Sequence, residues 1–230
     1  MHFHYALTLI QYRPLQPHPW ANKTTLQNNL LVRLTGYSDG KGTILNQIHS
    51  RHLKECLRYE VMKSDKPFSW FQVIHKAIKC PDRRFHFWWR IASYLHLSKK
   101  NPKLASKINR RLLSRYGLEI QLGARIGKGL QIAHYPGITV SHIVCAGENL
   151  LLRQNTTIGA KLDSKREKII RLGDNVDIGA NSCIIGSDLK IGNNVIIGAM
   201  SFINKDIPDN CTVYTEKSTN VIKNNSPVNN

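Results

Sequence analysis

The stretch EIQLGARIGKGLQIAHYPGITVSHIVCAGENL, residues 119–150, decides the fold, because one kind of side chain returns at every sixth position. The repeated positions are aliphatic: Ile120, Ile126, Ile132, Ile138, Val144 and Leu150. Neither the helical period of about 3.6 nor the strand period of about 2 accommodates this spacing. A short strand followed by a tight corner does, with the aliphatic side chain pointing inward on each face.

The period continues toward the C-terminus. Its phase slips to Ile158, a charged break covers residues 161–171, and one residue near Ser187 is extra. The later aliphatic positions are Leu172, Ile178, Ile184, Ile191, Ile197 and Ile203. Three faces make a triangular coil of about 18 residues, and stacked coils bury a continuous aliphatic column. The pattern favours a parallel β-helix over residues 118–215 and disfavours a β-sandwich.

Residues 62–117 predict two or three amphipathic helices, which makes the fold class α+β. A helix stop is expected at Tyr116-Gly117. The apolar positions at helical spacing form three sets: Phe68, Phe71, Ile74, Ala77 and Ile78; then Phe85, Trp88, Trp89, Ala92 and Leu95; then Leu104, Ile108, Leu112 and Leu113.

Residues 1–61 are polar, interrupted by prolines and mostly irregular, with one helix expected within 43–61. Two hypotheses account for this change of character at Met62. Translation begins at Met62 and the first 61 residues are an artefact of the assigned start, or the segment is a genuine N-terminal extension. Residues 216–230 read as a disordered tail.

Composition limits the partners and the compartment. The net charge of +18 suits a polyanion, a phosphorylated cofactor or an acidic glycan. The five cysteines are odd in number and lack C-x-x-C spacing, which disfavours a disulfide framework or a metal site and favours a reducing, cytoplasmic location. No apolar run is long enough to span a membrane, and the start is a poor signal peptide.

Residues 117–134 resemble the first coils of the serine acetyltransferase group, and the runs IGANSCIIG (178–186) and IGNNVIIGA (191–199) resemble its later coils. The run RIASYL (90–95) fits the helix that precedes them. Within this hexapeptide-repeat acyltransferase family, the sequence looks closest to the branch that O-acetylates capsule, colanic-acid or O-antigen polysaccharides or their sugar precursors. The resemblance implies a left-handed β-helix, acetyl-CoA as co-substrate, and a homotrimer.

The resemblance places a catalytic histidine at His134, in the run IAHYPGI. Imidazole suits a general base because its ordinary pKa is about 6.5. Glu119 lies fifteen residues earlier, close to one coil back, where the family often has an acid. We expect Glu119 to orient the His134 ring and stabilise its protonated form.

Two departures put free serine in doubt as the acceptor. Serine acetyltransferases usually have an acid directly before the histidine, and here that residue is Ala133. They also have a second histidine in the break between coils, whereas residues 161–171 contain none. His142 could substitute, although a solvated corner is the simpler role for it.

The resemblance implies that the coenzyme lies in a groove between neighbouring prisms. Small residues that would let its pantetheine arm approach the backbone are Gly159, Ala180, Gly198 and Ala199. Lys205 matches a position where the family often has a lysine near the coenzyme phosphates. The family's closing Gly-Val-Pro-Ala is absent, and residues 215–219 read TEKST.

Alternatives to polysaccharide O-acetylation are serine O-acetylation in cysteine biosynthesis and a non-catalytic β-helix scaffold. No nucleic-acid-binding module is recognisable, so the charge alone does not predict a nucleic-acid partner. The aromatic and basic run 83–90 leaves peripheral contact with a membrane open, although its apolar residues more simply pack against a helix or the prism.

Overall fold

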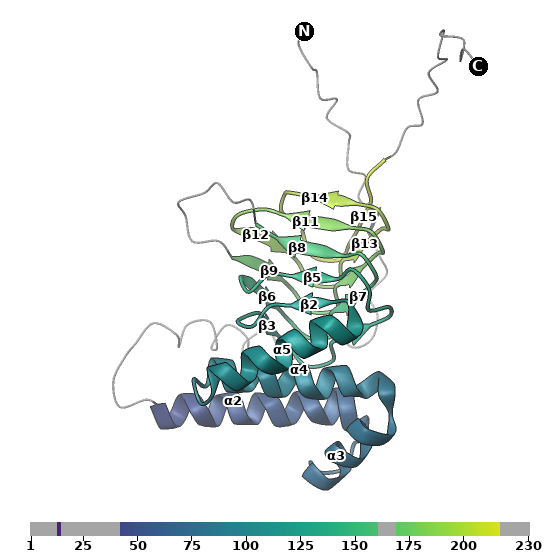
Figure 1. Ribbon diagram of the computed structural model, residues 1–230. Coiled ribbons are helices and arrows are strands. Elements are labelled where there is room, and N and C mark those ends of the chain that lie inside the picture. The colour runs from purple at the N-terminus through teal and green to yellow at the C-terminus, as the bar shows by residue number, and fades with distance from the viewer. Residues whose placement is uncertain (1–12, 15–41, 161–168, 217–230) are drawn as a thin grey trace, which may run out of the picture.

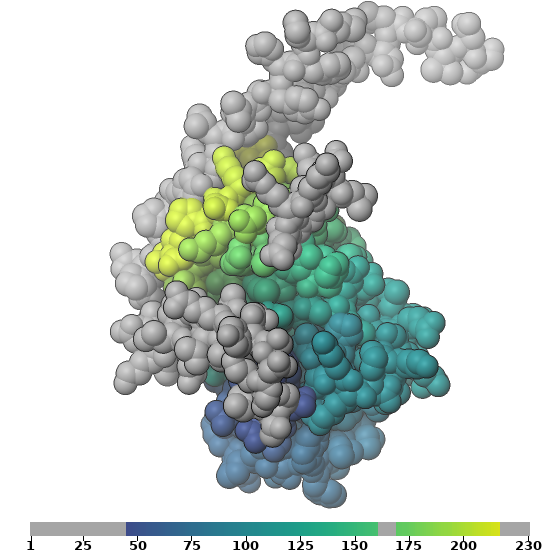
Figure 2. All heavy atoms as spheres, turned by 90° about the vertical axis from the view of Figure 1, so that its left-hand side faces the viewer, coloured from purple at the N-terminus to yellow at the C-terminus, as the bar shows by residue number. Residues whose placement is uncertain are grey.

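The computed structural model describes residues 13–14, 42–160 and 169–216. Helices form a base at one end, and a triangular stack of short strands rises from it (Figure 1). The view turned by 90° shows the same order, with blue helices below and green to yellow coils above (Figure 2). The expected disordered tail lies outside the described residues, apart from Glu216.

The base contains four α-helices and one π-helical turn within the described residues. These are α2 (Gly42–Leu57), η2 (Arg58–Met62), α3 (Trp70–Lys79), α4 (Pro81–Leu97) and α5 (Pro102–Tyr116). The Asn101 side chain accepts from Leu104 N–H (3.0 Å) and caps α5 at its start. Gly117, with φ of +64°, ends α5 where the sequence predicted a stop.

The expected division at residue 61 does not coincide with a structural boundary. α2 continues directly into η2, and the two pack against α4. Glu60 is only 4% exposed and receives two hydrogen bonds from Arg90 on α4, at 2.9 and 2.6 Å. The helix expected within residues 43–61 is confirmed as α2, and residues 42–61 pack as part of the helical base.

The remaining strands form three sheets. They are β2 (Glu119–Ile120), β3 (Arg125–Ile126), β4 (Gln131–Ile132), β5 (Thr139–Val140), β6 (Val144–Ala146), β7 (Leu151–Leu152), β8 (Thr157–Gly159), β9 (Ile170–Leu172), β10 (Asp177–Ile178), β11 (Cys183–Ile185), β12 (Leu189–Ile191), β13 (Ile196–Ile197), β14 (Phe202–Ile203) and β15 (Cys211–Val213). From β2 to β14, successive strands lie in the three sheets in turn, and each pairs in parallel with the strand one coil away. This is a parallel β-helix. β1 (Arg13–Pro14) pairs antiparallel with β15.

The strand register corrects one part of the predicted repeat. Ile120 pairs with Val140, not with Ile138, so the first coil is longer than a regular one. Ile138 is buried all the same, because it is the inward residue two positions before Val140. The extra length lies in the turn between β4 and β5, which contains His134. Ile158 pairs with Val140 of the preceding coil, so the apparent phase slip at Ile158 is a return to the regular coil spacing.

Two ladders of asparagines mark corners of the prism. Asn149, Asn175 and Asn194 have φ of 58°, 57° and 54°, in the left-handed region that asparagine tolerates better than most residues. The Asn149 side-chain N–H donates to the side-chain oxygen of Asn175, and the Asn175 side-chain N–H donates to that of Asn194, both at 2.9 Å. Asn155 bonds to Asn181 in the same way. Each ladder holds the corners of successive coils in line.

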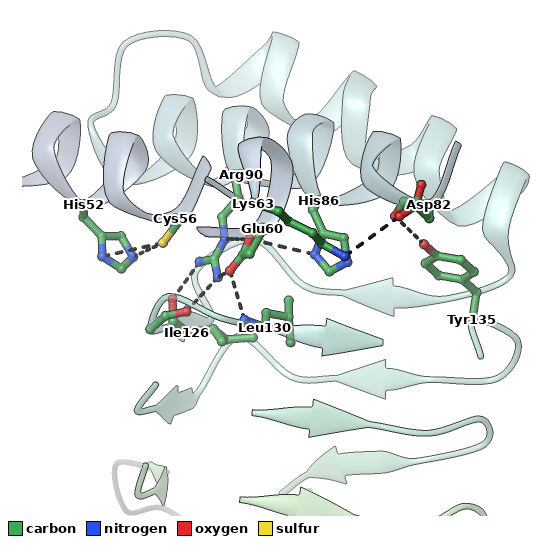
Figure 3. A network of polar contacts seen from close by, with 11 residues as sticks. His52, Cys56, Glu60, Lys63, Asp82, His86, Arg90, Ile126, Leu130 and Tyr135 are labelled. Atoms are coloured by element: carbon green, nitrogen blue, oxygen red, sulfur yellow. Dashed lines mark hydrogen bonds and ion pairs between the residues drawn. The ribbon is translucent and has the colours of Figure 1, made fainter. Parts of the chain in front are cut away.

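Side chains from the base form hydrogen bonds with the backbone at, or directly before, the first strand of each sheet. The indole N–H of Trp89 donates to the Ile120 carbonyl of β2 (3.2 Å), and the Arg90 guanidinium donates to the Ile126 carbonyl of β3 (2.7 Å). The Glu60 carboxylate accepts from the N–H of Leu130, directly before β4 (3.0 Å). Figure 3 shows Glu60 and Arg90 between the helices and the first coil. The base thus caps the edge strands β2, β3 and β4.

Among the described residues, no helix is long and apolar enough to cross a membrane. The same residues contain no group of three His, Cys, Asp or Glu side chains placed to hold a metal ion.

Candidate active site

His134 lies in the lengthened turn between β4 and β5, and its side chain is exposed. The residue that follows it anchors this turn. The Tyr135 ring packs against Tyr116 and Phe85, with ring centroids 5.0 and 5.6 Å apart, and its hydroxyl donates to the Asp82 carbonyl at 3.1 Å. Figure 3 shows Tyr135 reaching up from the coil toward the helix that carries Asp82. The helical base therefore fixes the turn that presents His134.

The Tyr135 hydroxyl keeps its proton throughout the physiological range. Burial, with smaller contributions from Tyr116 and Asp82, raises the pKa of Tyr135 to about 12. A protonated phenol donates to a backbone carbonyl, whereas a phenolate cannot. Tyr135 is therefore an anchor of the turn and not an acid in a reaction at neutral pH. This anchoring role was not predicted, although the sequence places an aromatic residue directly beside the proposed base.

The strand that carries Glu119 lies directly against the His134 turn. Glu119 N–H donates to the Ile138 carbonyl, and Gly137 N–H donates to the Gly117 carbonyl, both at 2.8 Å. The Glu119 side chain is half-buried, because it faces outward from β2 between two buried neighbours. No hydrogen bond joins the Glu119 and His134 side chains in the part of the chain that the structure describes. Glu119 and His134 thus lie on neighbouring segments, but the described structure does not contain the predicted contact in which Glu119 orients the His134 ring.

Three of the four small residues expected to contact the coenzyme lie along the same edge of the prism as His134. Ile132, Ile178 and Ile197 occupy equivalent places through the pairs β4–β7–β10–β13. Two residues beyond each of them stand His134, Ala180 and Ala199, and Gly198 directly precedes Ala199. Met200 N–H donates to the Ala180 carbonyl (2.7 Å), which confirms the stacking at this edge. The edge is thus lined by small residues above His134.

Gly159 and Lys205 lie on the other edge of the sheet that contains β5, β8, β11 and β14. Gly159 ends β8 and pairs with Ile185, while Lys205 follows β14 by two residues and is exposed. A Cβ on Gly159 would meet no described atom within 4 Å. By contrast, a Cβ on Gly179 would lie 2.4 Å from the Ala199 nitrogen. Packing within the described chain therefore explains why residue 179 is a glycine, but it does not explain why residue 159 is one.

The remaining candidates are placed apart from His134. His142 lies on the same edge as Lys205, and its Nδ1–H donates to the Gln121 side-chain oxygen at 3.0 Å. This pairing fits a solvated corner. Residues 161–168 of the charged break lie outside the described residues. All five cysteines are unpaired.

A second polar cluster lies within the base, away from His134 (Figure 3). It joins Glu60, Arg90 and His86, with His86 Nδ1 3.8 Å from the Glu60 carboxylate. Burial lowers the pKa of His86, opposed by Glu60. Burial and the Arg90 charge lower the pKa of His52 to about 4, so its ring is neutral at pH 7. Because these groups are enclosed and bonded to the first coil, they hold the site in place and do not face substrate.

Known proteins are similar to this chain in sequence and in fold. A serine acetyltransferase from Synechococcus elongatus is 34% identical over 126 residues, which is 54% of this chain and 50% of that protein. One from Staphylococcus epidermidis is 40% identical over 103 residues, 44% of this chain and 48% of that protein. The chain spans about half the length of these curated relatives. No protein-family model matches it.

Solved structures agree. The Neisseria gonorrhoeae serine acetyltransferase superposes with a TM-score of 0.56 at 25% identity, covering 75% of this chain and 64% of that one. The soybean apoenzyme, at 20% identity, shares the fold with a TM-score of 0.60 over 83% of this chain and 87% of that one. In sequence and in fold, the chain is similar to serine acetyltransferases. The expectation that it belongs with polysaccharide O-acetyltransferases is wrong, because the relatives at 32–40% identity carry the serine acetyltransferase name.

Proposed function

We propose that this chain is an acetyl-CoA-dependent serine O-acetyltransferase, with His134 as general base. The observation that carries the proposal is the similarity of about half of the chain to proteins named serine acetyltransferases, at 34% and 40% identity. One such protein, from Neisseria gonorrhoeae, has been solved in complex with serine. The same likeness supports a left-handed sense for the β-helix. The unpaired cysteines agree with a cytoplasmic location.

The chemistry requires one proton to move twice. His134 takes the proton of the serine hydroxyl as that oxygen attacks the thioester carbonyl of acetyl-CoA. The tetrahedral intermediate then collapses, the carbon–sulfur bond breaks, and the protonated imidazole returns the proton to the departing thiolate. The products are O-acetylserine and free coenzyme A. Glu119, on the neighbouring strand, stabilises the imidazolium once substrates close the site.

The small residues fit a narrow pantetheine arm. The absence of any described atom within 4 Å of a Cβ at Gly159 leaves room for a ligand to approach its backbone. Ala180, Gly198 and Ala199 leave the edge above His134 without bulky side chains. Lys205 supplies a positive charge for the coenzyme phosphates. We propose acetyl-CoA as the co-substrate held by these residues.

A homotrimer would bring together the candidate residues that lie on two different edges of one chain. In one chain, His134 and Ala180 line one edge of a sheet, while Gly159 and Lys205 line the other. Three prisms packed side by side would bring one copy's His134 edge against the next copy's Gly159 edge, which makes a shared groove. We propose that the complete site forms only between subunits. Light scattering that showed active monomers would contradict this arrangement.

The test is free-thiol release from acetyl-CoA with serine as acceptor, measured for the wild type, His134→Ala and His142→Ala. We expect turnover with serine, its loss by at least about a hundredfold in His134→Ala, and its retention in His142→Ala, which controls for losing an exposed imidazole. A circular dichroism spectrum would establish that each variant keeps its fold. Absence of turnover with serine in the wild type, or full activity in folded His134→Ala, would refute the proposal, and the latter result would favour the scaffold alternative.

A further inference from the structure

Helix α3 has an apolar face much wider than the surface that covers it. Val73 and Ala77, one turn apart, are buried against the neighbouring helices. Beside them on the same helix lies a second apolar strip that the described chain leaves exposed, apart from an edge-on contact between Phe68 and Trp70. Its members are Trp70, Phe71, Ile74 and Ile78. Phe71 is 81% exposed and Ile78 is 69% exposed. A monomer in water gains nothing from such a strip, which marks an interaction site.

The helix is held in place without using this strip. The Ser69 hydroxyl accepts from Gln72 N–H at 3.5 Å at the start of α3. At its end, the Arg84 guanidinium donates to the carbonyls of Ala77 and Ile78 at 3.2 and 2.7 Å. The apolar strip is therefore presented on a preformed helix, so a partner need not order it.

The segment of chain that contains the strip is basic. Residues 63–84 contain six Lys or Arg and two Asp, a net charge of +4. The basic residues are Lys63, Lys66, Lys76, Lys79, Arg83 and Arg84, and the acidic ones are Asp65 and Asp82. Asp82 lies 4.0 Å from Lys63 and 3.7 Å from Arg83, whereas no ion pair involves Lys66, Lys76 or Lys79 among the described residues. Lys76 and Lys79 lie in the last turn of α3, and Lys79 is exposed.

We propose that α3 binds an anionic lipid surface, with Phe71, Ile74 and Ile78 entering the interfacial layer and the lysines of this segment contacting lipid phosphates. An aromatic and aliphatic face bordered by lysines is the pattern of helices that lie in the plane of a membrane. α3 lies at the end of the molecule farthest from the last coils, where a flat surface can reach it (Figure 1).

Charge favours lipid over a second copy of this chain. An isologous contact through α3 would bring two equally basic patches together, on molecules that each carry +18. An anionic bilayer neutralises the same lysines, at about 1 kcal/mol for each one near its surface. The inference goes beyond the proposed acetyl transfer, because it predicts an enzyme that gathers at a membrane without any spanning helix.

The test is flotation of the full-length protein with vesicles of phosphatidylcholine alone or with about 30% phosphatidylglycerol. We compare the wild type with Phe71→Ser/Ile78→Ser and with Leu113→Ser, which removes an exposed apolar side chain on α5. We expect binding only to the anionic vesicles, a partition coefficient about tenfold or more lower in the double variant, and no change in Leu113→Ser. The double variant should acetylate serine in solution at the wild-type rate. A failure of the membrane proposal is therefore distinguishable from a failure of the proposed acetyltransferase function.

Three results would overturn the proposal. One is that the wild type binds neither kind of vesicle. A second is that the double variant binds anionic vesicles as well as the wild type does, which would assign the attraction to overall charge alone. The third is that light scattering shows the strip to be used by a second copy, with an assembly lost in the double variant and no vesicle binding by the wild type.

Discussion

Replacing Glu60 with alanine should destabilise the protein far more than a typical substitution of a charged residue. The carboxylate accepts three hydrogen bonds: from Arg90 Nε at 2.9 Å, from Arg90 Nη2 at 2.6 Å and from Leu130 N–H at 3.0 Å. Arg90 is 4% exposed, so Glu60→Ala leaves a buried cation without its counter-charge. Its remaining acceptors are the carbonyls of Ile126 and Gly127, both at 2.7 Å. Removal of one partner from a buried pair costs about 3–5 kcal/mol.

The assay is urea denaturation followed by circular dichroism at a fixed protein concentration, for Glu60→Ala, Arg90→Ala and the double variant. The double variant should cost little more than Glu60→Ala alone, because it removes the stranded charge together with its partner. Arg171→Ala is the matched control, since Arg171 pairs with Asp188 where both side chains are exposed, and it should cost less than about 1 kcal/mol. A loss below about 1 kcal/mol in Glu60→Ala, or strictly additive single losses, would refute the reasoning.

Three further predictions concern the turn, the pH and the glycines. Tyr135→Ala should lower kcat about tenfold or more by releasing the His134 turn, and Tyr135→Phe should restore most of it; unchanged kcat in a folded Tyr135→Ala protein would contradict the anchoring role. Burial lowers the pKa of His52 to about 4, so below about pH 6.5 the unfolded chain binds a proton at this residue that the folded chain does not bind. The protein should therefore have its full stability above that pH and lose stability toward pH 4, with a shallower loss in His52→Gln. Parallel curves of Tm against pH for the two proteins would contradict this. Gly179→Ala should lower the Tm, since its Cβ would lie 2.4 Å from a backbone nitrogen, and Gly159→Ala should instead raise the KM for acetyl-CoA at unchanged Tm; equal Tm losses would contradict the distinction.

The sequence predicted the prism because a six-residue period has few structural solutions. Every repeated aliphatic residue except Ile132 is buried, which confirms the inward face. The period could not reveal the lengthened first coil. Ile138 keeps the six-residue spacing, yet it stands two positions before the residue that pairs with Ile120, and both positions of a strand point inward. Periodicity alone does not distinguish them.

The helical base was predicted in outline, together with the helix within residues 43–61, but the packing of that helix against the base was not predicted. The residues that tie it to the prism are separated by long stretches of chain, as Glu60 and Leu130 show. A polar residue such as Glu60 within a weakly patterned segment gives no local indication that it will be buried. The candidate site shares this limit, because the sequence could place Glu119 near His134 in the coil order but could not show which side chains meet.

Trp89, Arg90 and Glu60 cap β2, β3 and β4, so further strands cannot add to the stack at its first coil. A β-helix is a column that another strand can extend from either open end, in the manner of a fibril. Here the base blocks templated addition at the first coil, sheet by sheet. Chains that lost the base would expose three unpaired edges at once, and we expect them to assemble end to end into filaments.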